Sequence, residues 1–248
     1  MRARRALASA VEFAALAALA ALAGCSFPEK HPGDGPAADA GPFSCAGQPF
    51  PTRAPAQIRI AGQALDFGTG VAGADVKVSG ILESGGTAFA TTTDATGNFS
   101  AVVDTGGAAL AAHVATALGT YVPSYFYPAH PFDGDVADLP LPMLTMMELA
   151  QIGNPADTAL VQVVVGDCLG ARLAGCTLAI APAPQQIEYT IDGALNPAAT
   201  ATDRTGYVLI YGQPEATATL TATCPTGPLR PAIIAIARSA TYFVVLEP

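Results

Sequence analysis

The chain contains no tryptophan and only three histidines among its 248 residues, and basic residues are scarce. The 11 Lys and Arg residues face 20 Asp and Glu residues, which gives a formal net charge of −9 at pH 7. Phosphate binding needs clustered Lys and Arg, so we expect no nucleic-acid partner. Neither the Gly-x-Ser-x-Gly motif of serine hydrolases nor the His-Glu-x-x-His motif of zinc proteases occurs. We therefore predict that the protein is not an enzyme, and no pattern indicates a cofactor.

Residues 1–24 have the composition of a targeting segment. Three arginines lie within the first five residues, and the Ala/Leu-rich run Leu7–Leu22 follows, interrupted only by Ser9 and Glu12. This run is short for a membrane span, which needs roughly 20 apolar residues. The segment Leu22-Ala23-Gly24-Cys25 resembles the lipobox of bacterial lipoproteins. That resemblance implies cleavage before Cys25 and a diacylglycerol on its thiol.

The lipobox resemblance also implies a location. Several acyl chains on one residue anchor a protein stably, so the membrane is the expected partner of Cys25. The residue after Cys25 is Ser26 rather than an aspartate. In the lipoproteins that this segment resembles, that choice implies sorting to the outer membrane or the cell surface. The alternative is an ordinary signal peptide with a chance cysteine. Removal of residues 1–24 takes away three Arg and one Glu, which leaves a net charge of −11 and suits a soluble extracytoplasmic surface.

Residues 25–55 are predicted to form a flexible tether. They are rich in Pro, Gly, Ala and Asp and contain few large apolar side chains. Such a segment cannot bury enough surface to offset the entropy of ordering. About 30 residues of flexible chain span roughly 30 Å, which would lift the folded part clear of a membrane.

The rest of the chain contains an internal repeat. Its segments are, in order, residues 58–65, 71–78 and 91–99 in the first copy and residues 160–165, 173–180 and 200–208 in the second. Val76 and Val78 alternate with polar residues, as Leu178 does with its neighbours, and this period of two is typical of half-buried strands. Each copy closes on Asp-x-Thr-Gly, at Asp94 and Asp203, which favours a type I turn. One carboxylate per turn is too few for calcium.

These segments resemble a known domain. Ala72-Gly-Ala-Asp-Val76 followed by Thr92-Thr-Asp-Ala-Thr-Gly-Asn-Phe99 is similar to the carboxypeptidase regulatory-like domain, a small prealbumin-like (transthyretin-like) β-sandwich. The resemblance implies an all-β protein with two tandem sandwiches, at residues 56–138 and 158–248. It is nearly silent on function. The related purine-degradation hydrolases end in Tyr-Arg-Gly-Ser, whereas this chain ends in Val-Leu-Glu-Pro, so their activity is not implied.

Residues 139–157 are expected to link the two sandwiches. Thr145 and Glu148 have capping-box spacing, which predicts one short helix in the linker. Met143, Met146 and Met147 are expected to pack against a neighbouring domain rather than to bind a soft metal.

Four cysteines other than Cys25 remain: Cys45, Cys168, Cys176 and Cys224. An even number in an exported protein suggests two disulfides, but spacing alone does not choose among the three connectivities. In the domain that the sequence resembles, the strand at 173–180 lies antiparallel to the strand at 218–224. This implies the pairs Cys176–Cys224 and Cys45–Cys168. The local alternative is Cys168–Cys176 with Cys45–Cys224.

Two clusters are candidate binding sites. Tyr121, Tyr125 and Tyr127 could stack on sugars if exposed, although aromatics near a strand end usually fill a core or a domain junction. His130, Asp133 and Asp135 form the densest polar cluster. They make a weak candidate for a metal site, and Pro131 and Gly134 favour a polar turn instead.

The sequence thus predicts a non-enzymatic, lipid-anchored cell-envelope protein that acts as a structural spacer or protein-binding module. Its expected partner besides the membrane is an envelope protein or a glycan. The alternative function is a carbohydrate-binding surface module that uses the Tyr121–Tyr127 cluster. An open pocket with His113 or His130 beside carboxylates would instead indicate an enzyme.

Overall fold

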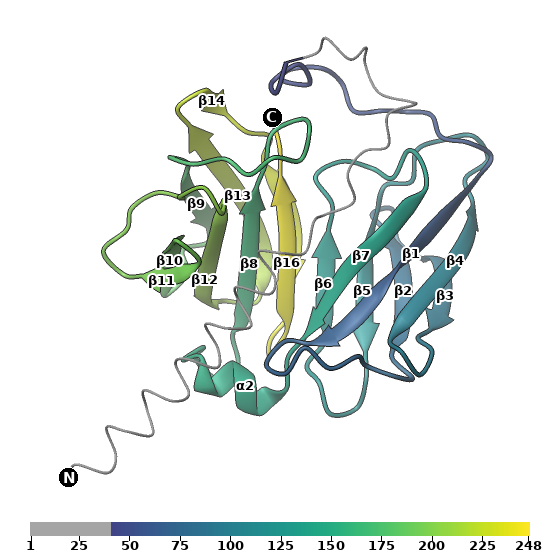
Figure 1. The fold of residues 1–248 in the computed structure, drawn as a ribbon, viewed down its shortest axis with the longest axis horizontal. Coiled ribbons are helices and arrows are strands. Elements are labelled where there is room, and N and C mark those ends of the chain that lie inside the picture. Colours follow the sequence, from purple (N-terminus) through teal and green to yellow (C-terminus); the bar gives the residue numbers. More distant parts are fainter. Residues whose placement is uncertain (1–40) are drawn as a thin grey trace.

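The computed structural model describes residues 41–248, so the predicted leader, Cys25 and the first part of the predicted tether lie outside the described residues. Its regular secondary structure is almost entirely β, arranged in a nine-stranded, a three-stranded and a four-stranded sheet (Figure 1). The predicted all-β fold class is therefore confirmed.

The first half of the chain forms seven strands, and their buried positions alternate as predicted. Their bounds are β1 (Gln57–Asp66), β2 (Lys77–Leu82), β3 (Thr87–Thr92), β4 (Asn98–Asp104), β5 (Ala112–Ala117), β6 (Ser124–Tyr127) and β7 (Val136–Met143). The three-stranded sheet has the order β4-β1-β7 and covers one face of β6-β5-β2-β3. Ile58, Ile60 and Val78 lie in the first hydrophobic core, between these layers.

The second half repeats this pairing scheme. Its strands are β8 (Ala159–Val165), β9 (Thr177–Ala181), β10 (Gln186–Ile191), β11 (Ala194–Asn196), β12 (Tyr207–Gln213), β13 (Ala216–Cys224), β14 (Gly227–Pro228), β15 (Ala232–Ile236) and β16 (Thr241–Leu246). β8 pairs antiparallel with β12 and parallel with β16, as β1 does with β4 and β7. β9 pairs with β13 as β2 pairs with β5. Val76 and Leu178 both lie in a hydrophobic core, as the repeat predicted.

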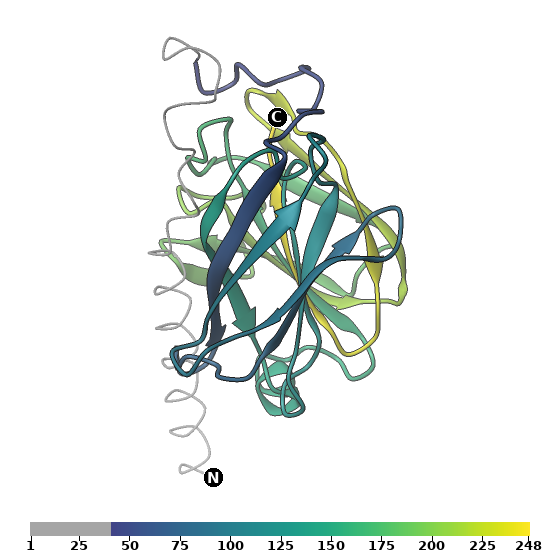
Figure 2. The ribbon, with the colours of Figure 1, turned by 90° about the vertical axis from the view of Figure 1, so that its right-hand side faces the viewer.

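The two halves share one sheet, which the sequence did not indicate. The nine-stranded order is β11-β10-β12-β8-β16-β6-β5-β2-β3, and β6 joins β16 in parallel. At this seam the hydroxyls of Ser124 and Thr241 lie 2.7 Å apart and are buried. Phe243 faces the first core, whereas Tyr242 and Val244 face the second. The three-stranded and four-stranded sheets therefore lie on opposite faces of the shared sheet (Figures 1 and 2).

The predicted helix is present as α2 (Met146–Gln151). Thr145 caps it: its hydroxyl accepts the amide of Glu148 at 3.2 Å, and the Glu148 carboxylate accepts the amide of Thr145 at 2.7 Å. Met143 is buried, but Met146 and Met147 are 54% and 69% exposed. The expected packing of the methionines is thus wrong for these two, because the helix turns them to solvent. Within residues 41–248, no helix has the length and apolar character needed to cross a bilayer.

A buried threonine just before each Asp-x-Thr-Gly turn bonds to the segment that leads into β2 or β9. In the first half the Thr93 hydroxyl accepts the amide of Val76 at 2.9 Å and donates to the Gly73 carbonyl at 2.7 Å. In the second half the Thr202 hydroxyl accepts the amide of Cys176 at 3.0 Å and donates to the Leu173 carbonyl at 2.8 Å. The recurrence of these bonds gives the repeat a structural reason.

Candidate functional site

The segment 41–50 is fixed to the second half by a disulfide. Cys45 is bonded to Cys168, with the two Cα atoms 5.7 Å apart. The amide of Cys168 also donates to the Pro42 carbonyl at 2.9 Å. Cys168 follows β8, so the bond attaches this segment directly to a central strand of the nine-stranded sheet.

Arg230, in the loop between β14 and β15, reinforces the same contact. Its guanidinium donates to the carbonyl of Cys45 at 2.8 Å and to that of Gln48. The guanidinium carbon also lies 4.3 Å from the centre of the Phe50 ring, within cation–π range. Sequence reasoning missed Arg230, because its partners lie more than 180 residues away along the chain.

The segment 52–55 then crosses to the first half. Arg53 forms a β-bridge with Ala108, and the amide of Ala54 donates to the Gly107 carbonyl at 3.2 Å. Residues 41–55 therefore contact both halves at one end of the molecule (Figure 1). The predicted flexible tether over 25–55 is wrong for residues 41–55, because a disulfide and long-range hydrogen bonds supply the order that their composition cannot.

The second disulfide is Cys176–Cys224, with the Cα atoms 4.0 Å apart. Thr177 pairs with Thr223 across β9 and β13, so the next pair along the ladder sets the two cysteines opposite each other. Both side chains are buried in the second core. The two disulfides are the pairs that the family resemblance implied, and the local Cys168–Cys176 pairing does not occur.

The three tyrosines of the predicted aromatic cluster do not share a surface. Tyr125 stacks on Tyr242 at 5.0 Å, and Tyr127 stacks on His113 at 4.5 Å; both tyrosines pack against the second core. Tyr121 packs instead against the first core, and its hydroxyl donates to Asp66 at 2.9 Å.

Burial raises the pKa of Tyr127 to about 12, as expected for a phenol withdrawn from water. Tyr125 and Tyr127 lie on the face of the nine-stranded sheet toward the second core, whereas Tyr121 packs against the first core. They therefore form no single stacking platform, which glycan binding through this cluster requires.

Side chains of the polar cluster at 130–135 bond to backbone groups of the protein. His130 Nδ1 lies 2.8 Å from the Pro131 carbonyl, and Asp135 accepts the amide of Arg59 at 2.7 Å. In the part of the chain that the structure describes, no group of three His, Cys, Asp or Glu side chains is placed to hold a metal ion. Burial lowers the pKa of His113, which lies half-buried against Tyr127.

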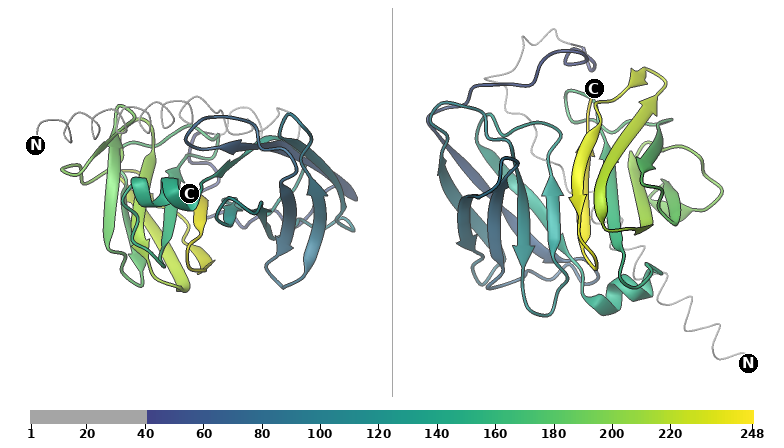
Figure 3. Two further views of the ribbon diagram at one scale, coloured as in Figure 1. Left: turned by 90° about the horizontal axis from the view of Figure 1, so that it is seen from below. Right: turned by 180° about the vertical axis from the view of Figure 1, so that it is seen from behind.

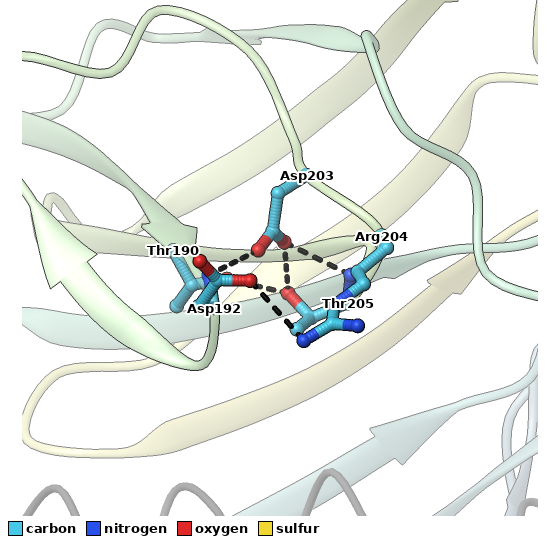
Figure 4. Close-up of polar contacts among 5 residues, drawn as sticks. All are labelled: Thr190, Asp192, Asp203, Arg204 and Thr205. Carbon is cyan, nitrogen blue, oxygen red and sulfur yellow. Dashed lines mark hydrogen bonds and ion pairs between the residues drawn. The ribbon is translucent and has the colours of Figure 1, made fainter.

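The Asp-x-Thr-Gly turns bind their own backbone. Asp94 accepts the amide and hydroxyl of Thr96 at 2.8 and 2.7 Å, and the hydrogen bond from that hydroxyl is the main reason its pKa is lowered. Asp203 likewise accepts the amide of Thr205 at 2.9 Å and the amide of Asp192 (Figure 4). These carboxylates are committed to turn geometry, so they do not form a cation site.

Arg204 and Thr190 extend the second turn. Arg204 pairs with Asp192 at 3.2 Å on the surface, and the hydroxyls of Thr190 and Thr205 lie 2.6 Å apart (Figure 4). This network joins the β10–β11 hairpin to the turn before β12. Partial burial alone would raise the pKa of Asp203, but the bonds from Thr205 and Asp192 lower it overall.

An open depression of about 290 Å³ lies beside Tyr121, between the loop before β2 and the loop after β5. Its lining includes Asp75, Lys77 and Tyr121 but neither His113 nor His130. No histidine is thus placed beside a carboxylate in this depression, which is the arrangement that would have indicated an enzyme here.

No protein-family model matches the sequence, and no curated protein matches it. Among solved structures, the TIE protein of Bacillus anthracis aligns with a TM-score of 0.28 and 10% identity, over 77% of this chain and 34% of that one. Shaft pilin SpaA from Lactobacillus rhamnosus GG aligns with a TM-score of 0.24 and 12% identity, over 79% and 98%. The minor pilin GBS52 of Streptococcus agalactiae aligns with a TM-score of 0.23 and 10% identity, over 77% and 94%. The chain spans about a third of the TIE protein, and at these scores the alignments carry no conclusion about its activity or partners.

Proposed function

We propose that this protein is a non-enzymatic, lipid-anchored envelope protein, built from two tandem carboxypeptidase regulatory-like sandwiches, that acts as a rigid spacer or protein-binding module. The observation that carries the proposal is the fixed entry of the chain at residues 41–55. A pull on the N-terminus reaches Cys45 first and passes through the disulfide to Cys168 and β8. The shared sheet then distributes that load over both halves.

The fixed entry segment also gives the anchored protein an orientation. The segment 41–55, which contains Cys45, lies at the end of the molecule opposite to α2 (Figure 1). With a lipid on Cys25, the remaining tether of residues 26–40 spans at most about 50 Å when fully extended. The end that carries α2, Met146 and Met147 would then point away from the membrane and be the first to meet a partner.

Membrane fractionation tests the anchor. Cys25→Ala should move the exported protein from the membrane fraction to the soluble fraction or stall its processing, because the thioether to the lipid cannot form. The double variant Cys45→Ala with Cys168→Ala is the control and should stay with the membrane. An unmodified Cys25 in the mass spectrum of the mature N-terminus would reject the anchor.

Turnover assays test the absence of an activity. We expect no hydrolysis in broad esterase, peptidase, glycosidase and hydroxyisourate assays. Turnover that disappears in His113→Ala or His130→Ala would overturn the non-enzymatic assignment.

A further inference from the structure

The outer face of the four-stranded sheet carries no charged side chain. Nine side chains of β9, β13 and β15 point outward and are exposed: Thr177, Ala179, Ala181, Thr217, Thr219, Thr221, Thr223, Ile233 and Ala235. We call them the threonine face. Thr219 is its centre, because it pairs with Ala181 on β9 and with Ile233 on β15. The strands that carry the threonine face are seen from behind the molecule in Figure 3, right.

The outer layer of the first half, the three-stranded sheet β4-β1-β7, is different. There the outward residues of β1 and β4 include Arg59, Asn98 and Asp104, all exposed. Both sheets cover the shared sheet from outside, one on each face, so an outer layer of this molecule can carry charge. Charged side chains are absent from only one of the two outer layers, in a chain of net charge −9. Such an uncharged exposed surface indicates that another molecule covers it.

We propose that the threonine face is a self-association surface, on which a second copy of this chain docks face to face. The net negative charge of the chain is the reason to expect a second copy at this face. Two copies of an acidic chain repel each other through most of their surfaces, and they meet without like-charge contacts where charge is absent. At one end of the face, Arg238 and Glu215 pair at 2.6 Å and so cancel each other at the rim.

The shape of the face suits a two-fold contact. Sheets pack face to face about 10 Å apart, and an isologous dimer uses the same patch on both partners. The threonine and isoleucine side chains are β-branched and stand on paired strands, so little conformational freedom is lost on docking.

The size of the face sets the expected strength. β13 is 9 residues long, or about 30 Å, and three strands are about 14 Å wide with their margins. The footprint is therefore at most roughly 400 Å² per copy, because β9 and β15 are only 5 residues long, and it lies below the size of a standard protein interface. We infer a weak dimer in solution that is favoured where copies are concentrated, as on a membrane.

Sedimentation velocity of the full exported chain, carrying Cys25→Ser, tests the proposal without the lipid anchor, so failure of the anchor leaves this test unaffected. We expect a reversible monomer–dimer equilibrium that tightens with added salt, because screening reduces repulsion between the two acidic copies. Thr219→Glu and Ile233→Glu should each weaken association by about tenfold or more, since a charge would be buried without a partner.

The matched control is Val102→Glu. Val102 is 59% exposed on the outer face of β4, much as Ile233 is 69% exposed on β15, and the variant adds the same charge. It should change association by less than about twofold, and an equimolar mixture of Thr219→Glu and Thr219→Lys should associate again. Thermal unfolding of each variant verifies that it is folded. A monomeric parent chain at every concentration, or equal weakening by Val102→Glu, would overturn the proposal.

Discussion

Removal of the Cys45–Cys168 disulfide should release the N-terminal segment while the two sandwiches stay folded. The perturbation is the double variant Cys45→Ser with Cys168→Ser, which leaves no unpaired thiol at the site. Three hydrogen bonds and one cation–π contact would then hold residues 41–50 to the second half: Cys168 to Pro42, Arg230 to Cys45 and to Gln48, and Arg230 over Phe50.

The free energy of these contacts is smaller than the entropy cost of ordering the segment. Each neutral hydrogen bond contributes about 1 kcal/mol net and a charge-assisted one about 1.5–3 kcal/mol, and the single guanidinium of Arg230 makes both of the latter. With the cation–π contact the sum is about 4.5–8 kcal/mol. Ordering the ten residues 41–50 costs roughly 10 kcal/mol in backbone entropy. Without the disulfide the segment should therefore detach.

Global stability should fall as well. The disulfide closes a loop with a sequence separation of 123 residues, for which the chain-entropy model gives about 5 kcal/mol as an upper value. For Cys176–Cys224, with a separation of 48, the same model gives about 4 kcal/mol. The two disulfides are thus similar in their effect on the unfolded chain and differ in what they hold in the folded one.

Hydrogen exchange measured by mass spectrometry separates the two effects. In Cys45→Ser with Cys168→Ser, peptides from 41–50 should exchange as fast as an unfolded chain, while peptides from β8 and β12 stay protected. The control, Cys176→Ser with Cys224→Ser, should lower the unfolding midpoint in urea and leave 41–50 protected. If 41–50 keeps its protection in the first variant, the balance of entropy against contacts given above is wrong.

Two further outcomes follow from the turn networks. Thr93→Val and Thr202→Val should each lower the free energy of unfolding by about 1–3 kcal/mol, because a buried amide and a carbonyl lose their partner; urea unfolding measures this, and the exposed Thr217→Val is the control expected within about 0.5 kcal/mol. The hydrogen bonds that lower the pKa of Asp203 stabilise the fold above its unfolded pKa of about 3.9, and this contribution is lost as pH falls through the lower folded value. Asp203→Asn should therefore show a shallower loss of stability below about pH 4, and an unchanged slope would contradict the assignment.

The sequence by itself determined the class of the fold and its repeat. Alternation at Val76, Val78 and Leu178 is a local property of strands, since side chains on successive residues point to opposite faces. The capping box at Thr145 and the turn at Asp94 are equally local, because their bonds join residues at most four apart along the chain. The turn at Asp203 has the same local bond from Thr205 and adds one from Asp192, 11 residues away. Such features can be recognised without knowledge of the rest of the molecule.

Only the tertiary structure decided how the halves are joined and where the chain enters. The β6–β16 seam and the contacts of Arg230 link segments that are far apart in sequence, and no local pattern specifies which strand edges meet. Composition predicted a flexible segment over 25–55, but a disulfide and an arginine elsewhere in the chain order residues 41–55. The threonine face arises in the same way. Each of its strands shows ordinary alternation, and the absence of charge becomes a property of a surface only when β9, β13 and β15 lie side by side.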